Sequence, residues 1–283
     1  MSSEESKCAF ALTLARTVGL SKKYRQRRPF SRKSFCIDAL TNVDLEIPFG
    51  SVTALVGESG SGKSTLASCL GLLEVPDRGE IWFEGSEISR WKSRKVAPLR
   101  PRIQIVFQQS SAALDPSFTA AEIIQEPLEV QRLESGPKLR MRACELMEEV
   151  GLSPDWAERS PLEFSGGQRQ RLAIARAIAL KPTLLIFDES FSGLDFSTQA
   201  QMLTLVLDLK TAHRLTYLLI SHDLSLVGQV ADFVAVMHQG SIVERGPRQQ
   251  VFNNPLHLQT RQLLRSVQTL ESAIPAAQTE GWQ

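Results

Sequence analysis

The apolar positions of this chain form short runs that alternate with longer stretches of helical spacing. Apolar runs of strand length occur at residues 52–56, 81–83, 103–107, 184–187, 217–220 and 233–237, after an alternating segment at Leu12 and Leu14. Helical spacing of apolar residues is found at 63–73, 167–180, 196–213 and 224–230. Strands that alternate with helices predict an α/β fold with a mostly parallel sheet. The turn-rich stretch at 79–85 predicts a small antiparallel β annex.

A different pattern fills the stretch between residues 120 and 160. It contains no strand-like run, and apolar residues such as Leu139, Ala143 and Leu146 recur at helical spacing beside charged neighbours. We therefore interpret this stretch as a helical insertion that ends before Pro161.

The end of the chain has a third pattern. Beyond Gly246-Pro247 the sequence predicts a short helical tail, and the polar stretch from Ala276 onward is expected to be disordered. The predicted organisation is a core with its β annex at 9–108 and 161–246, a helical subdomain at 109–160, and a C-terminal extension at 247–283.

Composition adds that the chain has the make-up of an ordinary soluble globular protein. It is 42% hydrophobic and 22% charged, with a net charge of +1. No overall field attracts nucleic acid or an anionic membrane, and no nucleic-acid partner is expected. The basic stretch from Lys22 to Lys33 is the local exception, and we interpret it as a solvated loop, with an anionic-lipid or nucleic-acid contact as the alternative.

The cysteines and the chain start exclude several classes of protein. The four cysteines show no CxxC pair and no histidine at metal-ligand spacing, which argues against zinc, an iron–sulfur cluster and a disulfide framework. Glu4 and Glu5 occupy the N-terminal region where a secretory signal would be basic. No apolar run approaches the ~20 residues needed to span a bilayer. The sequence therefore predicts a cytosolic chain that reaches a membrane only through a partner.

A glycine-rich segment follows the run at 52–56 and opens a helical stretch, as a phosphate-binding P-loop does. In such a loop, backbone N–H groups and the helix N-terminus converge on phosphate oxygens. Lys63 would reach the β- and γ-phosphates, Ser64 would offer a hydroxyl to Mg²⁺, and Thr65 would lie near the α-phosphate. The alternative is an ordinary glycine turn at a helix start. The predicted nucleotide-binding residues are Gly57, Glu58, Ser59, Gly60, Ser61, Gly62, Lys63, Ser64 and Thr65.

Two adjacent carboxylates end the apolar run at 184–187, where a Walker B segment would have them. Carboxylates at a strand's C-terminal end face the ligand crevice of an open α/β sheet. Asp188 can hold Mg²⁺ through water. Glu189 is then placed to orient or deprotonate the attacking water, a contribution of about 10²–10⁴-fold in rate. The alternative is that the pair caps the next helix.

Ser165, Gly166, Gly167 and Gln168 precede the helical stretch at 167–180 and would form a second anion cradle. A single P-loop does not need a second cradle for its own nucleotide, whereas a partner subunit does. The order of P-loop, Leu162-to-Arg171 segment and Walker B resembles the ATP-binding cassette (ABC) ATPase family. The resemblance implies a P-loop NTPase (RecA-like) core and a head-to-tail dimer in which this segment closes over the partner's γ-phosphate. The alternative is a flexible linker.

The same resemblance assigns further residues. Gln108 matches the Q-loop glutamine, which contacts Mg²⁺ and water, and Asp195 in Ser192-Gly193-Leu194-Asp195 matches the D-loop along the dimer seam. His222 resembles the switch histidine that contacts the γ-phosphate, either polarising the phosphate or positioning the water with Glu189. Tyr24 matches the aromatic residue that stacks on adenine, with Phe35 as its rival.

Several positions depart from the family pattern, and others indicate a branch within it. Ser190 stands where proline is usual and Gly193 where alanine is common, but neither change removes a ligand or a base. Phe164 and the Glu-Phe-Ser-Gly-Gly-Gln-Arg-Gln-Arg run look like the oligopeptide, dipeptide and nickel importer branch. In the tail, Leu258 and Gln259 replace the usual Pro-Tyr pair.

The resemblance therefore implies an ATP-hydrolysing subunit of an ABC transporter, with ATP and Mg²⁺ as cofactors. Its partners would be a second ATPase subunit, identical or paralogous, two transmembrane permease subunits and, indirectly, a solute-binding protein. It would lie peripherally on the cytoplasmic face of the inner membrane and power import of oligopeptides or dipeptides. A nickel or metal-chelate importer is the alternative cargo class, and a non-transport ABC ATPase clamp is the alternative of another class. The choice of import over export rests on family analogy.

Overall fold

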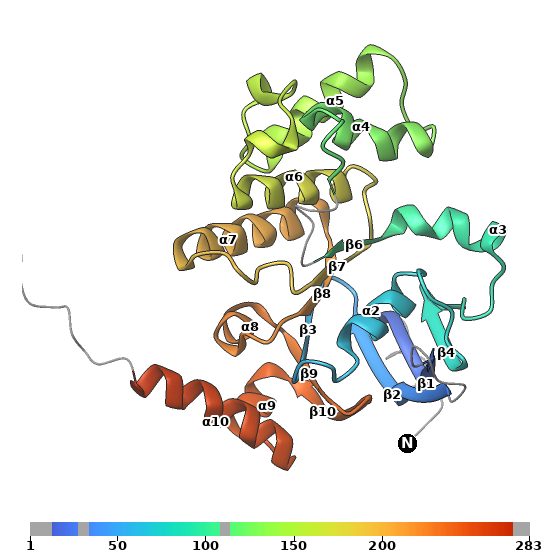
Figure 1. Cartoon of the computed structure of the whole chain (residues 1–283), viewed down its shortest axis with the longest axis vertical. Coiled ribbons are helices and arrows are strands. Elements are labelled where there is room, and N and C mark those ends of the chain that lie inside the picture. Colours follow the sequence, from blue (N-terminus) through green and yellow to red (C-terminus); the bar gives the residue numbers. More distant parts are fainter. Residues whose placement is uncertain (1–12, 28–33, 108–113, 274–283) are drawn as a thin grey trace, which may run out of the picture.

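The computed structural model describes residues 13–27, 34–107 and 114–273. Its elements form two β-sheets flanked by helices, with a group of helices at one end and a helical tail at the other (Figure 1). The larger sheet has six strands in the order β10-β9-β3-β8-β7-β6. These strands span Ser241–Pro247, Phe233–His238, Val52–Val56, Thr216–Ile220, Leu184–Asp188 and Ile103–Phe107, respectively.

All strands of this central sheet run parallel except β10, which is antiparallel to β9. Every residue of β3, β7 and β8 is buried. A strand covered on both faces has no solvent side, which is why these strands are continuous apolar runs in the sequence. The predicted α/β fold with a mostly parallel sheet is confirmed.

Alternate residues of the central strands pack into two separate apolar cores, one on each face of the sheet. Ala54, Phe187 and Leu219 face the core under α6 (Gly166–Ile178), α7 (Phe196–His213) and α8 (Leu224–Val230). Leu55, Ile186 and Leu218 face the opposite core, which contains α2 (Lys63–Leu70) and the second sheet. The period of two in a strand therefore divides one apolar run between two layers.

The helix boundaries agree with the sequence pattern for α7 and α8 but not for α2. The apolar spacing predicts a helix over 63–73, whereas α2 ends at Leu70. Gly71 follows as its C-cap, and Leu72 adopts a left-handed conformation with φ of 59°. That turn cannot continue a right-handed helix, so the helix ends three residues earlier than predicted.

The second sheet is larger than the annex that the sequence predicts. It is antiparallel in the order β2-β1-β4-β5, with strands Ser34–Pro48, Thr13–Arg27, Arg78–Phe83 and Ser86–Glu87. The sequence-based interpretation of the basic stretch from Lys22 to Lys33 as a solvated loop is wrong for the residues up to Arg27. Lys22, Lys23 and Tyr24 lie in β1 and pair with β2. A strand with one exposed face accommodates charges, and the Lys23 ammonium lies 2.8 Å from an Asp38 carboxylate oxygen across the pair.

Helices occupy most of the described part of the stretch predicted to be a helical subdomain. There α4 (Ala120–Val130) and α5 (Pro137–Glu149) pack on each other and on α6. The chain reaches them from β5 through α3 (Ser93–Val96), a 3₁₀ segment at Ala97–Arg102 and strand β6. The division into domains at 109 and 160 stays a prediction. The tail contains α9 (Arg248–Asn253) and α10 (Leu258–Ala273).

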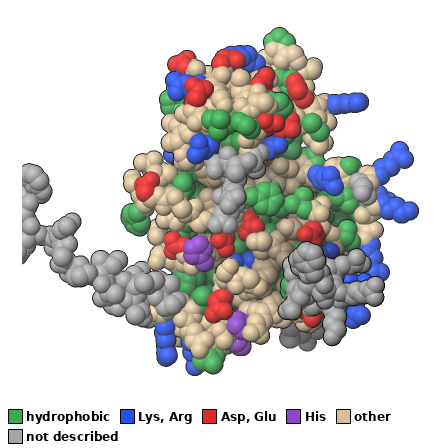
Figure 2. Space-filling model, in the orientation of Figure 1, with side chains coloured by type: hydrophobic (Ala, Val, Ile, Leu, Met, Phe, Trp, Pro, Cys, Tyr) green, Lys and Arg blue, Asp and Glu red, His purple; other side chains and the backbone are tan. Residues whose placement is uncertain are grey.

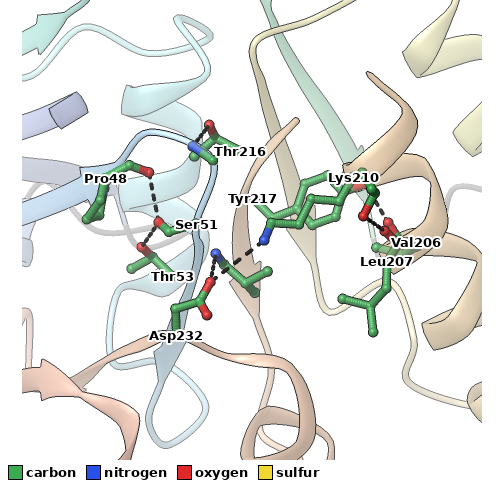
Figure 3. Close-up of polar contacts among 12 residues, drawn as sticks. Pro48, Ser51, Thr53, Val206, Leu207, Lys210, Thr216, Tyr217 and Asp232 are labelled. Atoms are coloured by element: carbon green, nitrogen blue, oxygen red, sulfur yellow. Dashed lines mark hydrogen bonds and ion pairs between the residues drawn. The ribbon is translucent and has the colours of Figure 1, made fainter. Parts of the chain in front are cut away.

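Polar contacts hold the start of strand β3 against neighbouring segments of the chain (Figure 3). The backbone N–H of Val52 donates to a carboxylate oxygen of Asp232 at 2.8 Å, and the Lys210 ammonium lies 3.8 Å from the same oxygen. The Thr216 hydroxyl accepts from the N–H of Gly50 at 2.9 Å. Because β3 leads directly into the glycine-rich loop, these contacts set where that loop begins.

The surface carries side chains of both charges. Figure 2 shows acidic and basic side chains spread over one face, with basic ones gathered at the edge by α3. Within the described residues, no helix is both long and apolar enough to span a bilayer.

The buried hydroxyl of Tyr217 provides a test of this packing. The hydroxyl donates to the Val206 carbonyl at 2.7 Å, joining β8 to α7 (Figure 3). Tyr217→Phe removes a hydrogen bond worth about 1 kcal/mol and is expected to lower the melting temperature by about 2–4 °C. Thr204→Val, which removes an exposed hydroxyl bond on the same helix, is the control and should leave the melting temperature within about 1 °C. Equal losses in both variants would show that burial of the Tyr217 hydroxyl contributes nothing.

Candidate active site

The glycine-rich loop lies at the carboxyl end of β3 and is wedged between neighbouring backbones. A side-chain carbon on Gly57 would collide with the carbonyl oxygen of Met237, and one on Gly62 would collide with that of Ala39. Gly62 is also the N-cap of α2, at φ of 107°, and offers no side chain to the first helical N–H groups. Those N–H groups and the positive end of the helix are therefore available to an anion. Glu58, Ser59 and Gly60 form the exposed outer turn.

Lys63 is only 5% exposed and lies within the curl of the loop. Its ammonium donates to the carbonyl oxygens of Gly57 at 2.8 Å and Glu58 at 2.9 Å. Burial lowers the pKa of Lys63, while the negative charges of Glu189 and Asp188 act in the opposite direction. The Ser61 hydroxyl is buried and has no hydrogen-bond partner among the described residues. The loop thus combines a poorly solvated cation with an unsatisfied polar group.

Ser64 and Asp188 bring two oxygen atoms together beneath the loop. The Ser64 hydroxyl donates to a carboxylate oxygen of Asp188 at 3.1 Å. Burial raises the pKa of Asp188, and the hydrogen bond from Ser64 partly offsets this effect. A hydroxyl and a carboxylate suit Mg²⁺, which keeps most of its water and phosphate ligands. No cluster of three or more His, Cys, Asp or Glu side chains able to hold a metal ion occurs in the part of the chain that the structure describes.

Glu189 and His222 follow the ends of neighbouring strands β7 and β8. A carboxylate oxygen of Glu189 lies 3.5 Å from Nδ1 of His222. Glu189 adopts a left-handed backbone with φ of 49°, and its N–H donates to the Ile220 carbonyl at 3.0 Å. A strained backbone held in place by the next strand is typical of functional positions. Both side chains meet at the same edge of the sheet as the P-loop.

Tyr24 projects from β1 towards α2. Its hydroxyl donates to a carboxylate oxygen of Glu74, just beyond the end of α2, at 2.6 Å. The ring is thereby placed next to the helix that begins at the P-loop. The side chain of the rival residue, Phe35, lies outside the part of the chain that the structure describes.

The segment of Ser165, Gly166, Gly167 and Gln168 forms the start of α6. The Ser165 hydroxyl accepts from the N–H of Gln168 at 3.3 Å, and the Gln168 side chain accepts from the N–H of Ser165 at 2.9 Å. This reciprocal capping box leaves Ser165 and Gly166 exposed at a helix N-terminus. In Figure 1, this helix lies well apart from α2.

Asp195 caps the neighbouring helix α7. Its carboxylate accepts from the N–H of Thr198 at 2.9 Å and from the Thr198 hydroxyl at 2.6 Å, and these bonds lower the pKa of Asp195. Thr198 also contacts Gly167, whose added side-chain carbon would lie 2.7 Å from the Thr198 methyl. The start of α6 and the start of α7 therefore form one continuous exposed surface.

The structure brings together most, but not all, of the predicted site residues. The P-loop, Asp188, Glu189 and His222 share one edge of the sheet, with Tyr24 beside α2. Ser165 to Gln168 and Asp195 form a second group on α6 and α7. Gln108 lies outside the described residues. Sequence reasoning missed Glu74, because nothing in the sequence connects a carboxylate with a tyrosine fifty positions away.

Two of the departures from the family pattern, at Ser190 and Gly193, have local explanations. The buried Ser190 hydroxyl donates to the Val106 carbonyl of β6, a bond that proline could not make. Gly193 adopts φ of 78°, a conformation that alanine would occupy only under strain.

Comparison with known proteins agrees with this geometry. Residues 40–192 match the ABC transporter family. The chain is 41% identical over 251 residues to the dipeptide transport ATP-binding protein DppF of Haemophilus influenzae, covering 89% of this chain and 77% of that protein. It is 45% identical over 238 residues to the glutathione import ATP-binding protein GsiA of Salmonella choleraesuis, covering 84% of this chain but 38% of GsiA. This chain thus spans about two fifths of the length of GsiA.

A solved structure provides the same result for the fold. The dimeric ATP-binding cassette MJ0796, bound to ADP and Pi in a post-hydrolysis state, superposes with a TM-score of 0.74 at 28% identity. The match covers 83% of this chain and 99% of MJ0796. Together with the P-loop edge described above, these matches show that the chain belongs to the ABC transporter family as an ATP-binding cassette.

Proposed function

We propose that this protein binds and hydrolyses ATP as a subunit of an ABC importer for short peptides. The observation that carries the proposal is the sheet edge where the P-loop, Asp188, Glu189 and His222 meet. The names of the relatives supply the cargo class, because one transports dipeptides and the other imports glutathione, which is itself a tripeptide.

The phosphates would bind where the P-loop backbone and the start of α2 already point N–H groups. Lys63 would exchange its two carbonyl partners for phosphate oxygens, which relieves the cost of a buried ammonium held only by neutral acceptors. Ser64 and Asp188 would hold Mg²⁺, with Gln108 joining them. The ion supplies positive charge that neutralises the phosphates.

Hydrolysis would depend on the pair at the ends of β7 and β8. Glu189 would accept the proton of the attacking water, from a position where a left-handed backbone follows the end of β7. His222, 3.5 Å from that carboxylate, would orient the same water or donate a hydrogen bond to the γ-phosphate.

The start of α6 would serve a partner subunit. Ser165 and Gly166 are exposed at the start of α6, and this helix lies apart from α2 in Figure 1, so we expect them not to close over a nucleotide bound at their own P-loop. A head-to-tail dimer, of identical or paralogous chains, would place them over the partner's nucleotide, with Asp195 at the seam. The related cassette MJ0796 is a dimer in its solved structure.

A groove beside the predicted helical subdomain would receive the permease. It has a volume of about 200 Å³ and is lined by β6, α4 and α6, including Phe107, Pro127 and Arg176. Phe107, the last residue of β6, lines this groove, and Gln108 follows it in the sequence, so we expect changes at the nucleotide to be passed to a membrane subunit through this groove. The chain would then lie peripherally on the cytoplasmic face of the membrane, with a solute-binding protein delivering the cargo.

Replacing the proposed base tests hydrolysis and dimer formation together. Glu189→Gln should lower ATPase activity by about 10²–10⁴-fold while ATP binding persists, because only the water-activating carboxylate is lost. Size-exclusion chromatography with light scattering should show an ATP-dependent dimer. Adding Ser165→Arg should abolish that dimer but leave ATP binding to the monomer intact. Hydrolysis at the wild-type rate by Glu189→Gln would overturn the assignment of the base.

The same variant tests the transporter assignment. Affinity capture of the tagged Glu189→Gln chain with ATP, from detergent-solubilised membranes of its native cell, should recover two multi-span proteins. Growth on dipeptides as the only source of a required amino acid should then fail when the gene is deleted and return with the wild-type chain. The matched control is Lys63→Ala, which should neither bind ATP tightly nor restore growth. Capture of ribosomes or DNA-repair factors in place of membrane proteins would favour a non-transport clamp.

The raised pKa of Asp188 predicts a stability effect with a definite sign. Folding favours the protonated carboxyl, so its stabilising effect is fully present below the ordinary carboxyl pKa and is lost as the pH rises through the raised pKa. Asp188→Asn should therefore raise the melting temperature of the nucleotide-free chain at pH 7, and this gain should shrink near pH 4. Scanning fluorimetry across that pH range measures both.

Asp115 is the control of opposite sign for that experiment. Hydrogen bonds from the Ser117 hydroxyl and N–H lower the pKa of Asp115, so its charge stabilises the fold above the ordinary carboxyl pKa. Asp115→Asn should not raise the melting temperature at pH 7. A lower melting temperature for Asp188→Asn at pH 7 would contradict the argument from burial.

A further inference from the structure

The hydroxyl of Tyr24 is held just beyond the end of helix α2, where it donates a hydrogen bond to a carboxylate oxygen of Glu74 at 2.6 Å. A short hydrogen bond to a carboxylate is among the stronger neutral-to-charged contacts in proteins. This bond therefore gives the aromatic ring a fixed direction relative to the P-loop helix.

Lys22 adds a second constraint on the same ring. Its ammonium lies 5.7 Å from the ring centroid of Tyr24 and 3.5 Å from the carboxylate oxygen of Glu74. It also donates to the Val75 carbonyl at 2.7 Å, so its position does not depend on Glu74 alone. A cation over one face of the ring leaves the opposite face for a flat ligand.

Glu74 is itself held by the turn that ends α2. The N–H groups of Leu73 and Glu74 both donate to the Ser68 carbonyl, at 2.9 and 3.1 Å. A separate contact joins the same turn to β1, because the Asp77 carboxylate accepts from the backbone N–H of Lys23 at 2.7 Å. Glu74 contacts the ring residue, whereas Asp77 contacts only the strand backbone.

We propose that Glu74 is a positioning residue that pre-orients the Tyr24 ring for the adenine base and thereby sets the affinity for ATP. The inference rests on the proposed function, in which Tyr24 stacks on the base. A side chain that is already immobilised loses no rotamer freedom when the ligand binds, and this saving is worth about two- to tenfold in affinity for one side chain. Burial and the bond to Glu74 raise the pKa of Tyr24 to about 12, so the hydroxyl stays protonated and able to donate at neutral pH.

A double-mutant cycle tests the proposal on the full chain with Mg²⁺ and a fluorescent ATP analogue. Glu74→Ala and Tyr24→Phe should each raise the Kd about two- to tenfold, because each removes the bond that directs the ring. The double variant should be no weaker than the weaker single variant, since both remove the same interaction.

Three comparisons separate positioning from a general structural role. Inorganic tripolyphosphate has no base, so its competition for the site should be unchanged in Glu74→Ala. Glu74→Gln keeps an acceptor oxygen and should restore most of the affinity, even though it removes the charge that pairs with Lys22. Asp77→Ala, which loosens the same turn without touching the ring, should bind ATP as wild type does.

The outcomes that would overturn the inference are equally specific. Equal weakening of ATP and tripolyphosphate by Glu74→Ala would mean that Glu74 supports the P-loop and not the ring. Additive losses in the double variant would mean that Glu74 acts independently of the Tyr24 hydroxyl. A wild-type chain that fails to bind ATP would instead refute the proposed function.

Discussion

The close packing of the glycine-rich loop against its neighbours is the constraint on which the rest of the site depends. Gly57 leaves no room for a side-chain carbon next to the backbone of β9, and Gly62 leaves none next to the backbone of β2. The loop is therefore fixed to both sheets at once. Because Lys63 and Ser64 come directly after it, the positions of the cation and of the hydroxyl beside Asp188 follow from this contact.

Parallel strands convert that local fit into an active site. In β3, β7 and β8 the carboxyl ends meet at one edge, so residues more than a hundred positions apart become neighbours. Ser64 and Asp188 are 124 residues apart in sequence and share a hydrogen bond. The same arrangement places Glu189 and His222 within 3.5 Å of each other. An open α/β sheet thus supplies the framework, and the residues at the strand ends supply the chemistry.

The charged groups at this edge are electrostatically unfavourable by themselves. Burial raises the pKa of Asp188 and lowers the pKa of Lys63, which means that both groups are poorly solvated in their charged forms. A ligand that brings phosphate to Lys63 and a divalent cation to Asp188 would compensate both groups together. This is the pattern expected when stability is given up at a binding site.

The sequence by itself determined the parallel strands of the central sheet and indicated most of the residues that the structure brings to its P-loop edge. The strands at 52–56 and 184–188 are buried on both faces, so burial forces them to be continuous apolar runs that can be recognised without a structure. The glycines of the P-loop can be recognised in the sequence for a similar reason. At Gly57 and Gly62 the neighbouring backbone is so close that a residue with a side chain would collide with it. Helix α7 begins after a capping aspartate, and its first and last residues agree with the helix that the apolar spacing predicts at 196–213.

Only the tertiary structure decided the features that depend on contacts across the chain. Strands β1 and β2 have one exposed face and carry charges, so their local pattern resembles a loop until the Lys23–Asp38 pair is seen. Strand β10, which sequence analysis missed, is half-exposed along most of its length and is defined by its pairing with β9. The hydrogen bond from Tyr24 to Glu74 joins residues that are distant in sequence. The separation of α6 from α2 is likewise visible only in the folded chain. Local sequence patterns reflect which residues are buried. The partner of an exposed or polar group is instead decided by the fold, because the fold brings that group and its partner together.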